Sequence, residues 1–269
     1  MIGVETEEAV TQYTLGLAKG GALLPETRIL LEAWQTGEDL TAFGERVLRD
    51  DLLGRSTARR IDDIVRRCFA ARFLTPDDAA ARHMQCLIQG AIPRQLYTDL
   101  VFFYTAQHEH LLRDAAVTRY WPSVRSGSLT IGNSEVYQLL VEAERDGRIL
   151  RGWSDEIKRD MAGRVLIALT EFGLLAPLKP GRREVLPYRP IDGTVVYLTH
   201  LLHFAGVTDA SLAVQPQWAL FGLEPRDVWN RLDMLAGEGW FILQRAGSVV
   251  RIAWKHVRME EVVDVLAGR

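Results

Sequence analysis

The sequence contains little cysteine and no long apolar run, and each absence excludes a class of protein. Its 2 cysteines, Cys68 and Cys86, lie at a spacing that fits neither a disulfide framework nor a zinc module, which favours a reducing compartment. Nowhere do about eighteen uncharged apolar residues follow one another, and the N-terminus "MIGVETEEAVTQY" lacks the basic start and apolar stretch of a signal peptide. We therefore expect a cytoplasmic protein with neither an export signal nor a membrane span.

An excess of charge of one sign is also absent. The 32 lysine and arginine residues nearly balance the 35 aspartate and glutamate residues, which gives a formal net charge of -3. Because no global positive field recruits polyanions, the composition argues against a nonspecific coat on nucleic acid, and any such contact must come from local patches. The chain is nevertheless 48% hydrophobic over 269 residues, which is enough for a substantial core in one large or two modest domains.

Motifs of catalysis and metal binding are missing as well. The sequence has no glycine-rich phosphate loop, nucleophile elbow or HExxH pair, and the spacing of its Ser, His and Asp residues selects no triad. His108 and His110 diverge on a helix, whereas His200 and His203 share a face but have no cysteine or acidic cluster nearby. We expect a protein that is not an enzyme and that uses no metal or other cofactor.

The first 125 residues carry helical patterns throughout, which predicts a helical N-terminal domain (1–125). Proline or a small polar residue stands near the start of most of these helices, and glycine closes two of them. The expected helices are 25–37, about 39–48, 56–73 with Ser56 as N-cap, about 78–90, and roughly 93–113.

The rest of the chain predicts two units in which helices precede a short hairpin, the order of a winged helix-turn-helix. In 126–190, helices capped by Ser134 and Ser154 lead to two extended runs around the turn "KPGR". In 191–269, helices over about 193–205, 217–222 and 225–237 lead to a hairpin at 246–248 and a closing helix over 258–267. The predicted fold class is mainly α: a helical N-terminal domain, then two winged helix-turn-helix-like units with short β-hairpin wings.

An arginine-rich segment, "RSTARRIDDIVRRCFAARF" (55–73), stands out in a chain without excess positive charge. At about 100° per residue, one face of the helix is apolar and would pack on a core. Asp62 and Asp63 each precede an arginine by four residues, so they are expected to pair with Arg66 and Arg67. The polar side of this helix has two possible roles. It is either a solvent-exposed face stabilised by ion pairs, or a surface on which Arg59 and Arg60, near the N-terminal end, contact phosphate. The apolar face comprises Ile61, Ile64, Val65, Cys68 and Phe69.

Three further sets of residues are candidates for nucleic-acid contact. Arg159 and Arg164 face outward on the helix after Ser154, although acids lie beside them. The following turn supplies Lys179, Arg182 and Arg183, which suits either a wing on phosphate or a merely soluble loop.

In the last unit, Arg226 and Asn230 share an outer face with Asp227 and Asp233. Asparagine and arginine can read bases, but the two acids would repel the DNA backbone. This unit fits protein contact and DNA positioning about equally.

Three strings resemble a known family: "GGALLPETRILLEAW" (20–34), "LLGRSTARRIDDIVRRCF" (52–69) and "RGWSDEIKRDMAGRVLIALTEFGLL" (151–175). Scattered over roughly residues 10–190, they resemble the BrxA family of BREX bacteriophage-defence systems. The resemblance implies a largely helical, non-enzymatic protein that binds double-stranded DNA and works beside other BREX proteins, among them a methyltransferase and ATPases. Typical members end near where the last eighty residues of this chain begin. The way in which family members contact DNA therefore does not carry over directly to this chain. A winged-helix transcriptional regulator and a protein–protein scaffold within a defence complex remain the alternatives.

Overall fold

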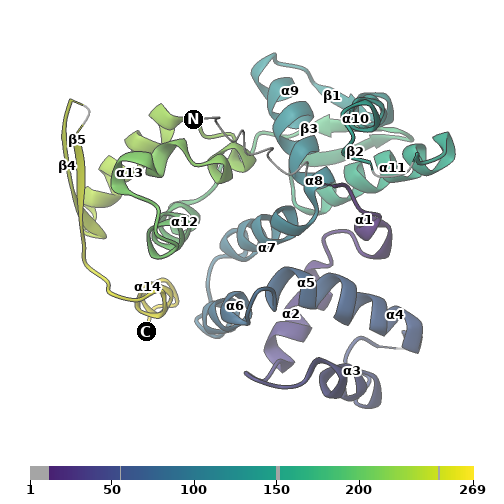
Figure 1. Ribbon diagram of the computed structural model, residues 1–269, viewed down its shortest axis with the longest axis horizontal. Coiled ribbons are helices and arrows are strands. Elements are labelled where there is room, and N and C mark those ends of the chain that lie inside the picture. The colour runs from purple at the N-terminus through teal and green to yellow at the C-terminus, as the bar shows by residue number, and fades with distance from the viewer. Residues whose placement is uncertain (1–11, 55, 150–151, 248) are drawn as a thin grey trace, which may run out of the picture. The chain divides into compact units, whose positions relative to one another are not determined.

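The computed structural model describes residues 12–54, 56–149, 152–247 and 249–269. The protein is mainly helical, with 62% helix and 9% strand, and its strands form small antiparallel sheets (Figure 1). Each of its two compact units combines two separated chain segments. The first unit contains Met1–Gly21 and Glu109–Leu186, and the second contains Ala22–His108 and Pro187–Arg269. The segments of the two units therefore alternate along the chain. The division into three consecutive domains, 1–125, 126–190 and 191–269, stays a prediction.

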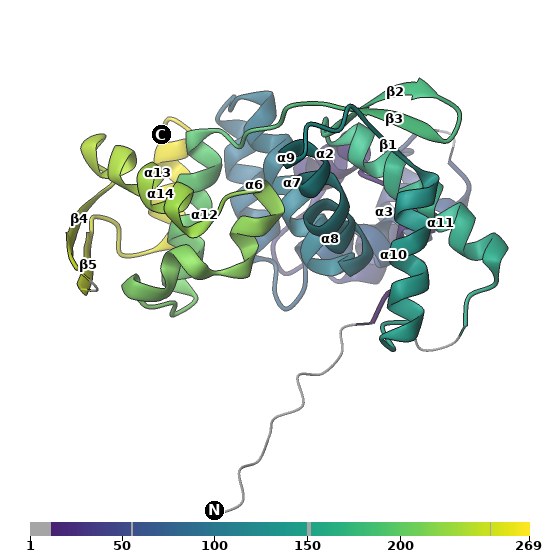
Figure 2. The same ribbon diagram turned by 90° about the horizontal axis from the view of Figure 1, so that it is seen from above.

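The first unit consists of helices packed on a three-stranded sheet. Its strands have the spatial order β1-β3-β2, and both pairings are antiparallel. Figure 2 shows β2 and β3 running side by side to a common turn. The elements are α1 (Gly16–Lys19), α8 (His110–Ala115), η2 (Ala116–Tyr120), α9 (Trp121–Arg125), β1 (Thr130–Gly132), α10 (Asn133–Arg145), α11 (Asp155–Glu171), β2 (Leu175–Lys179) and β3 (Arg182–Val185).

The core of the first unit lies where α10, α11 and the sheet meet. Ile131 of β1, Leu140 of α10 and Val165 of α11 are each fully buried. Ser154 begins α11 as predicted, because its hydroxyl accepts a hydrogen bond from the Ile157 amide at 3.3 Å. The predicted extended runs around "KPGR" are confirmed as β2 and β3.

Over its described residues, the second unit is helical apart from one hairpin, β4–β5, which packs beside α13 (Figure 1). The predicted C-terminal helices, the two paired strands of the hairpin and the closing helix are confirmed, with 3-10 turns at η3 and η4. Residue 248 of the predicted hairpin turn lies outside the described residues. Its elements are α2 (Leu24–Ala33), α3 (Leu40–Arg49), α4 (Ala58–Asp62), η1 (Asp63–Phe69), α5 (Ala70–Phe73), α6 (Ala79–Gln89), α7 (Arg94–His108), α12 (Asp192–Phe204), η3 (Asp209–Val214), η4 (Pro216–Phe221), α13 (Pro225–Gly237), β4 (Phe241–Ala246), β5 (Val249–Trp254) and α14 (Met259–Leu266).

Residues from both segments of the second unit share its core. Asp99 of α7 is fully buried and accepts hydrogen bonds of 2.6 Å from the hydroxyls of Tyr188 and Thr194. The ring of Phe102 packs on that of Phe221. The last eighty residues are therefore packed into the same unit as 22–108.

The predicted apolar face of the arginine-rich helix is confirmed. Ile61, Ile64, Val65, Cys68 and Phe69 are all buried. The helix runs through α4, the π-helical turn η1 and α5 without leaving helical geometry.

Four predicted helix boundaries are wrong. The helix expected over 25–37 ends at Ala33. Thr57, and not Ser56, caps the arginine-rich helix by accepting from the Arg60 amide at 3.2 Å. The helix expected over 93–113 breaks at Glu109, whose φ of -96° and ψ of 81° are not helical. The helix expected to be capped by Ser134, α10, begins after Gly132 instead.

Candidate nucleic-acid interface

The turn between β2 and β3 is built by Pro180 and Gly181. Proline fixes the φ that the first central residue of a turn needs, and Gly181 has a φ of 73°, which a residue with a side chain adopts at a cost. The carbonyl of Gly181 accepts a 3.0 Å hydrogen bond from the Asn133 amide at the start of α10. A side chain at Gly132 would lie only 3.0 Å from the same carbonyl oxygen. The turn is therefore held closely against β1 and α10.

Three cations surround this turn. Lys179 and Arg182 lie directly opposite each other in the β2–β3 register, and both side chains are exposed. Arg183 is half-buried, and its guanidinium donates to the Arg182 carbonyl at 3.0 Å. No carboxylate of a described residue forms an ion pair with any of the three, although the charge of Arg182 acts on Glu135. Opposed like charges destabilise a strand pair in isolation, and a bound anion would relieve that repulsion.

The outward face of α11 is less basic than the turn. The guanidinium of Arg159 lies 5.8 Å from the ring centre of Tyr137, and Arg164 pairs with Asp160 at 3.4 Å. Glu156 is exposed on the same helix. Because acids alternate with the arginines, α11 presents no continuous positive surface to phosphate. Tyr137 was not predicted as a neighbour of Arg159, since a lone tyrosine on an adjacent helix gives no local signal of a cation–π contact.

Arg59 and Arg60 belong to the second unit and not to the unit that carries the turn. Both side chains are exposed. The ion pairs predicted beside them are confirmed, at 2.7 Å between Arg66 and Asp62 and at 3.2 Å between Arg67 and Asp63. This surface is therefore largely neutralised internally.

Arg226 and Asn230 are exposed on α13, also in the second unit. The carboxylate of Asp227 accepts from the Glu224 amide and so caps the helix. Asp233 forms an ion pair with Arg245, a cation of the β4–β5 hairpin that also lies over a tryptophan ring. The second hairpin thus has one of its two arginines neutralised.

The histidines do not gather into a metal site. His203 stacks on Trp254 with ring centres 3.9 Å apart, and Nδ1 of buried His200 lies 2.8 Å from the Val196 carbonyl oxygen. Burial lowers the pKa of His200 to about 4. Within the described part of the chain, no group of three or more His, Cys, Asp or Glu residues is arranged to hold a metal ion. None of the described helices is both long and apolar enough to cross a bilayer.

The fold and surfaces define a mainly helical protein with small antiparallel sheets and an exposed basic turn. The BrxA family model matches residues 11–199, which is more than two thirds of the chain, so the chain belongs to the BrxA family and is a BREX-associated protein. The match ends inside α12, so residues 200–269 lie beyond it although they pack with 22–108. Comparison with curated proteins gave no match.

Proposed function

We propose that this protein is a non-enzymatic accessory protein of a BREX phage-defence system that binds double-stranded DNA through a winged-helix module in its first unit. The order of elements supports the module: β1, two helices, then β2 and β3, with β3 between the other strands. In this arrangement α11 takes the place of the recognition helix and the β2–β3 turn is the wing. Residues 191–269 are a second winged-helix-like segment.

One observation carries the DNA-binding proposal. Lys179 and Arg182 face each other at the exposed turn, and no described carboxylate pairs with either. Lysine and arginine contacts to phosphate position a protein on DNA without reading sequence. The acids on α11 oppose base reading, so we expect the wing to contribute most of the affinity and little sequence preference.

The family supplies the system in which the protein would act. A member of the BrxA family with an exposed basic wing is suited to hold duplex DNA for other BREX proteins, which are its proposed partners. Its chemistry would then lie in those partners, because the sequence carries no motif of catalysis.

Fluorescence anisotropy with a labelled duplex of arbitrary sequence tests the proposal. Replacing Lys179, Arg182 and Arg183 by alanine should weaken binding and reduce the slope of log Kobs against log salt by about 0.9 for each phosphate that the variant no longer neutralises. Arg145→Ala is the matched control. This exposed residue ends α10, about 18 Å along the helix from the residue that contacts the turn.

Other outcomes separate the alternatives. Unchanged affinity in the triple variant would contradict DNA contact by the wing. Tight binding to one promoter site, with weak binding elsewhere, would favour a transcriptional regulator. No binding even at low salt would favour a scaffold that joins defence proteins without touching DNA.

The candidate residues of the second unit need a separate measurement. If Arg59 and Arg60 also contact phosphate, their replacement by alanine should weaken duplex binding and leave the melting temperature nearly unchanged, since both side chains are exposed. Arg226→Ala and Asn230→Ala test α13 in the same way. A decrease in affinity only in the wing variants would restrict DNA contact to the first unit.

A further inference from the structure

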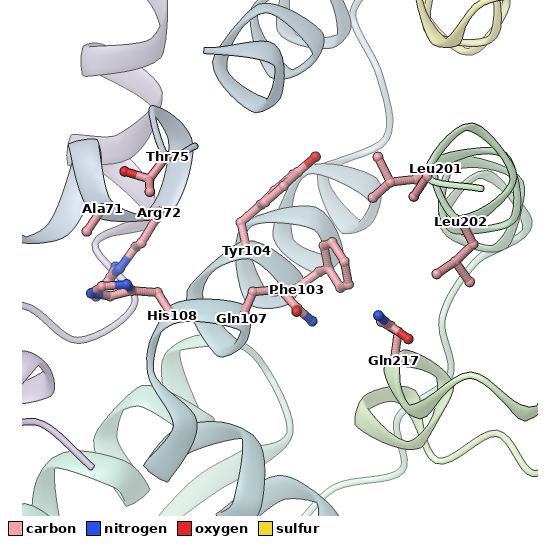
Figure 3. A pocket seen from close by; sticks show the side chains of 11 residues that line it. Ala71, Arg72, Thr75, Phe103, Tyr104, Gln107, His108, Leu201, Leu202 and Gln217 are labelled. Carbon is pink, nitrogen blue, oxygen red and sulfur yellow. The ribbon is translucent and has the colours of Figure 1, made fainter. Parts of the chain in front are cut away.

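A cavity and an open strand edge are features of the second unit that the proposed DNA contact does not use. The cavity has a volume of about 400 Å³ and is lined by residues of α5, α7, α12 and η4 (Figure 3). Two of its polar groups are engaged within the protein: the Tyr104 hydroxyl lies 2.6 Å from that of Tyr197, and the Thr75 hydroxyl donates to the Ala70 carbonyl. The lining indicates no particular ligand, whereas a strand edge specifies another extended strand as its partner.

The β4–β5 hairpin has one covered edge, on the side of β5. The carboxylate of Asp209 in η3 accepts hydrogen bonds from the Ile252 amide at 2.8 Å and from the Trp254 indole at 3.3 Å. The Ile252 amide therefore points away from β4. Because Leu243 lies directly opposite Ile252 in the antiparallel register, the backbone N–H and C=O of Leu243 point away from β5. The same groups of Arg245, two residues further along β4, point the same way.

The edge on the side of β4 is open. Among the described residues, none forms a hydrogen bond with the outward N–H or C=O of Leu243 or Arg245. Proteins usually protect such an edge with proline, lysine or a bulge. The edge strand of the first unit, β2, has all three, because it contains Pro177 and Lys179 with a register shift between them. In contrast, β4 has the sequence FILQRA and pairs with β5 at every position without a bulge.

We propose that β4 is an interface between two copies of this chain, in which the two β4 strands pair antiparallel about a twofold axis. In the register that uses the open edge most fully, Leu243 lies opposite Leu243 of the second copy and exchanges both backbone hydrogen bonds with it. Arg245 then lies opposite Phe241 of the second copy. The two hairpins become one continuous antiparallel sheet.

The charges and exposed side chains of the hairpin favour a second copy as the partner. Arg245 pairs with Asp233 of its own chain, and in this register it faces an aromatic residue, so no like charges oppose each other. Ile242 is 64% exposed, and the two Ile242 side chains would lie diagonally across the axis and cover each other in part. Because Asp209 covers the outer edge of β5, association stops at the dimer and does not continue into a filament.

Sedimentation velocity of the native chain without DNA tests the proposal, over loading concentrations from about 1 to 500 µM. Two short strands bury less than the about 1,200 Å² of a stable complex. We therefore expect a concentration-dependent dimer with a Kd on the order of 10 to 100 µM.

Arg245→Pro and Arg245→Ala form a matched pair. Both variants lose the ion pair with Asp233, but only proline removes the outward N–H. Proline is tolerated on an edge strand where this N–H faces solvent, so the hairpin should remain. Arg245→Pro should weaken the dimer at least about tenfold relative to Arg245→Ala, because each copy loses a backbone hydrogen bond across the interface.

A charge exchange at Leu243 tests the twofold axis itself. Leu243→Lys and Leu243→Glu each place like charges opposite each other and should be monomeric, whereas their equimolar mixture should associate at least about tenfold more tightly than either variant alone. The same exchange at Val257 is the control, because this residue is 77% exposed and lies outside β4. Both Val257 variants and their mixture should dimerise like the native chain.

Each outcome either supports or overturns the interface. A native dimer that is weakened in Arg245→Pro and restored in the Leu243 mixture supports it. If one set of variants does not fold, as judged by circular dichroism, the other set decides. The proposal is overturned if the native chain stays monomeric throughout, which would leave the edge to a strand of another protein. It is also overturned if Arg245→Pro dimerises like Arg245→Ala, or if the folded Leu243 variants associate no better when mixed. None of these outcomes changes the expectation for the wing.

Discussion

Phe102 of α7 and Phe221 of η4 pack edge to face, with ring centres 6.0 Å apart and ring planes at 86°. Phe102 lies within the part of the chain that matches the BrxA family, and Phe221 lies beyond it. Both rings are buried. The segment after residue 199 therefore completes the core of the second unit and is not attached to it only by a linker.

Replacement of Phe221 by alanine should lower the free energy of unfolding by about 3 to 5 kcal/mol, as is usual when a buried aromatic ring leaves a cavity. The variant would lack both the ring packing with Phe102 and the stacking with Tyr188. Urea denaturation measures the difference. Val214→Ala is the control, because Val214 is 63% exposed and should change stability by no more than about 0.5 kcal/mol. Equal effects of the two variants would mean that the C-terminal segment does not share this core.

Gly90 tests a second contact of the C-terminal segment. A β-carbon at this position would lie 2.3 Å from the carbonyl oxygen of Ala267, at the end of α14. Gly90→Ala should therefore displace α14 and cost about 1 to 3 kcal/mol of stability.

The matched comparison is Gly163→Ala in α11. Gly163 lies in a helix, and a β-carbon there would meet nothing within 4 Å. The substitution should stabilise the protein by about 0.5 to 1 kcal/mol, because alanine loses less backbone entropy in a helix. Denaturation of both variants measures the difference. A neutral Gly90→Ala substitution would contradict the close contact of α14 with α6.

Asp99 should make stability depend on pH. Burial raises the pKa of its carboxyl from 3.8 to about 6, although hydrogen bonds from Thr194 and Tyr188 act in the opposite direction. Between pH 4 and 6 the unfolded chain has released this proton while the folded chain still holds it. Stability contributed by Asp99 is therefore fully present at low pH and falls as pH rises through this window, by on the order of 3 kcal/mol.

Urea denaturation of the native chain and of Asp99→Asn from pH 4 to 7 isolates this contribution. The stability of the native chain relative to the variant should decrease with rising pH and level off only after the pH has passed through the folded pKa of about 6. Tyr188→Phe removes one hydrogen bond to the carboxylate and should extend the decrease to higher pH. A difference that stays flat, or that rises with pH, would contradict a raised pKa.

The sequence pattern did not identify the N-cap of the arginine-rich helix correctly. Ser56 and Thr57 are adjacent, and either hydroxyl could accept from the first helical amides. Thr57→Ala should cost about 1 kcal/mol, whereas Ser56→Ala should be nearly neutral, since only Thr57 bonds to the Arg60 amide. Thermal denaturation of both variants checks this. A larger destabilisation in Ser56→Ala would assign the cap to Ser56.

Local patterns predicted most of the helices and both hairpins, because periodicity, caps and turn residues act over a few residues. The interleaving of 22–108 with 187–269 could not be predicted in that way. It depends on contacts such as those of Asp99 with Tyr188 and Thr194, between residues about a hundred positions apart. No local signal specifies such a partner.

The basic wing was predicted from the sequence, whereas the burial of Arg72 was not. Lys179, Arg182 and Arg183 surround a Pro-Gly turn, which a single sequence can locate. Arg72 does carry a local signal: it follows Ile61 and Cys68 by eleven and four residues and so falls on the buried face of its helix. An arginine on an apolar stripe indicates a buried charge, but the residues opposite it come from elsewhere in the chain.

The acids of α11 allow a test of how closely that helix approaches DNA. Asp160→Asn frees Arg164 from its ion pair and removes one negative charge from the outward face. If α11 lies near the duplex, affinity at low salt should rise about threefold, in line with the ~0.2 to 1 kcal/mol of an exposed charge interaction. The gain should shrink as salt rises, because exposed charges are screened. Asp146→Asn, an exposed acid beyond the far end of α10, should leave the anisotropy titration unchanged. An unchanged affinity in Asp160→Asn, together with weaker binding in the wing variants, would mean that the wing contacts DNA while α11 remains in solvent.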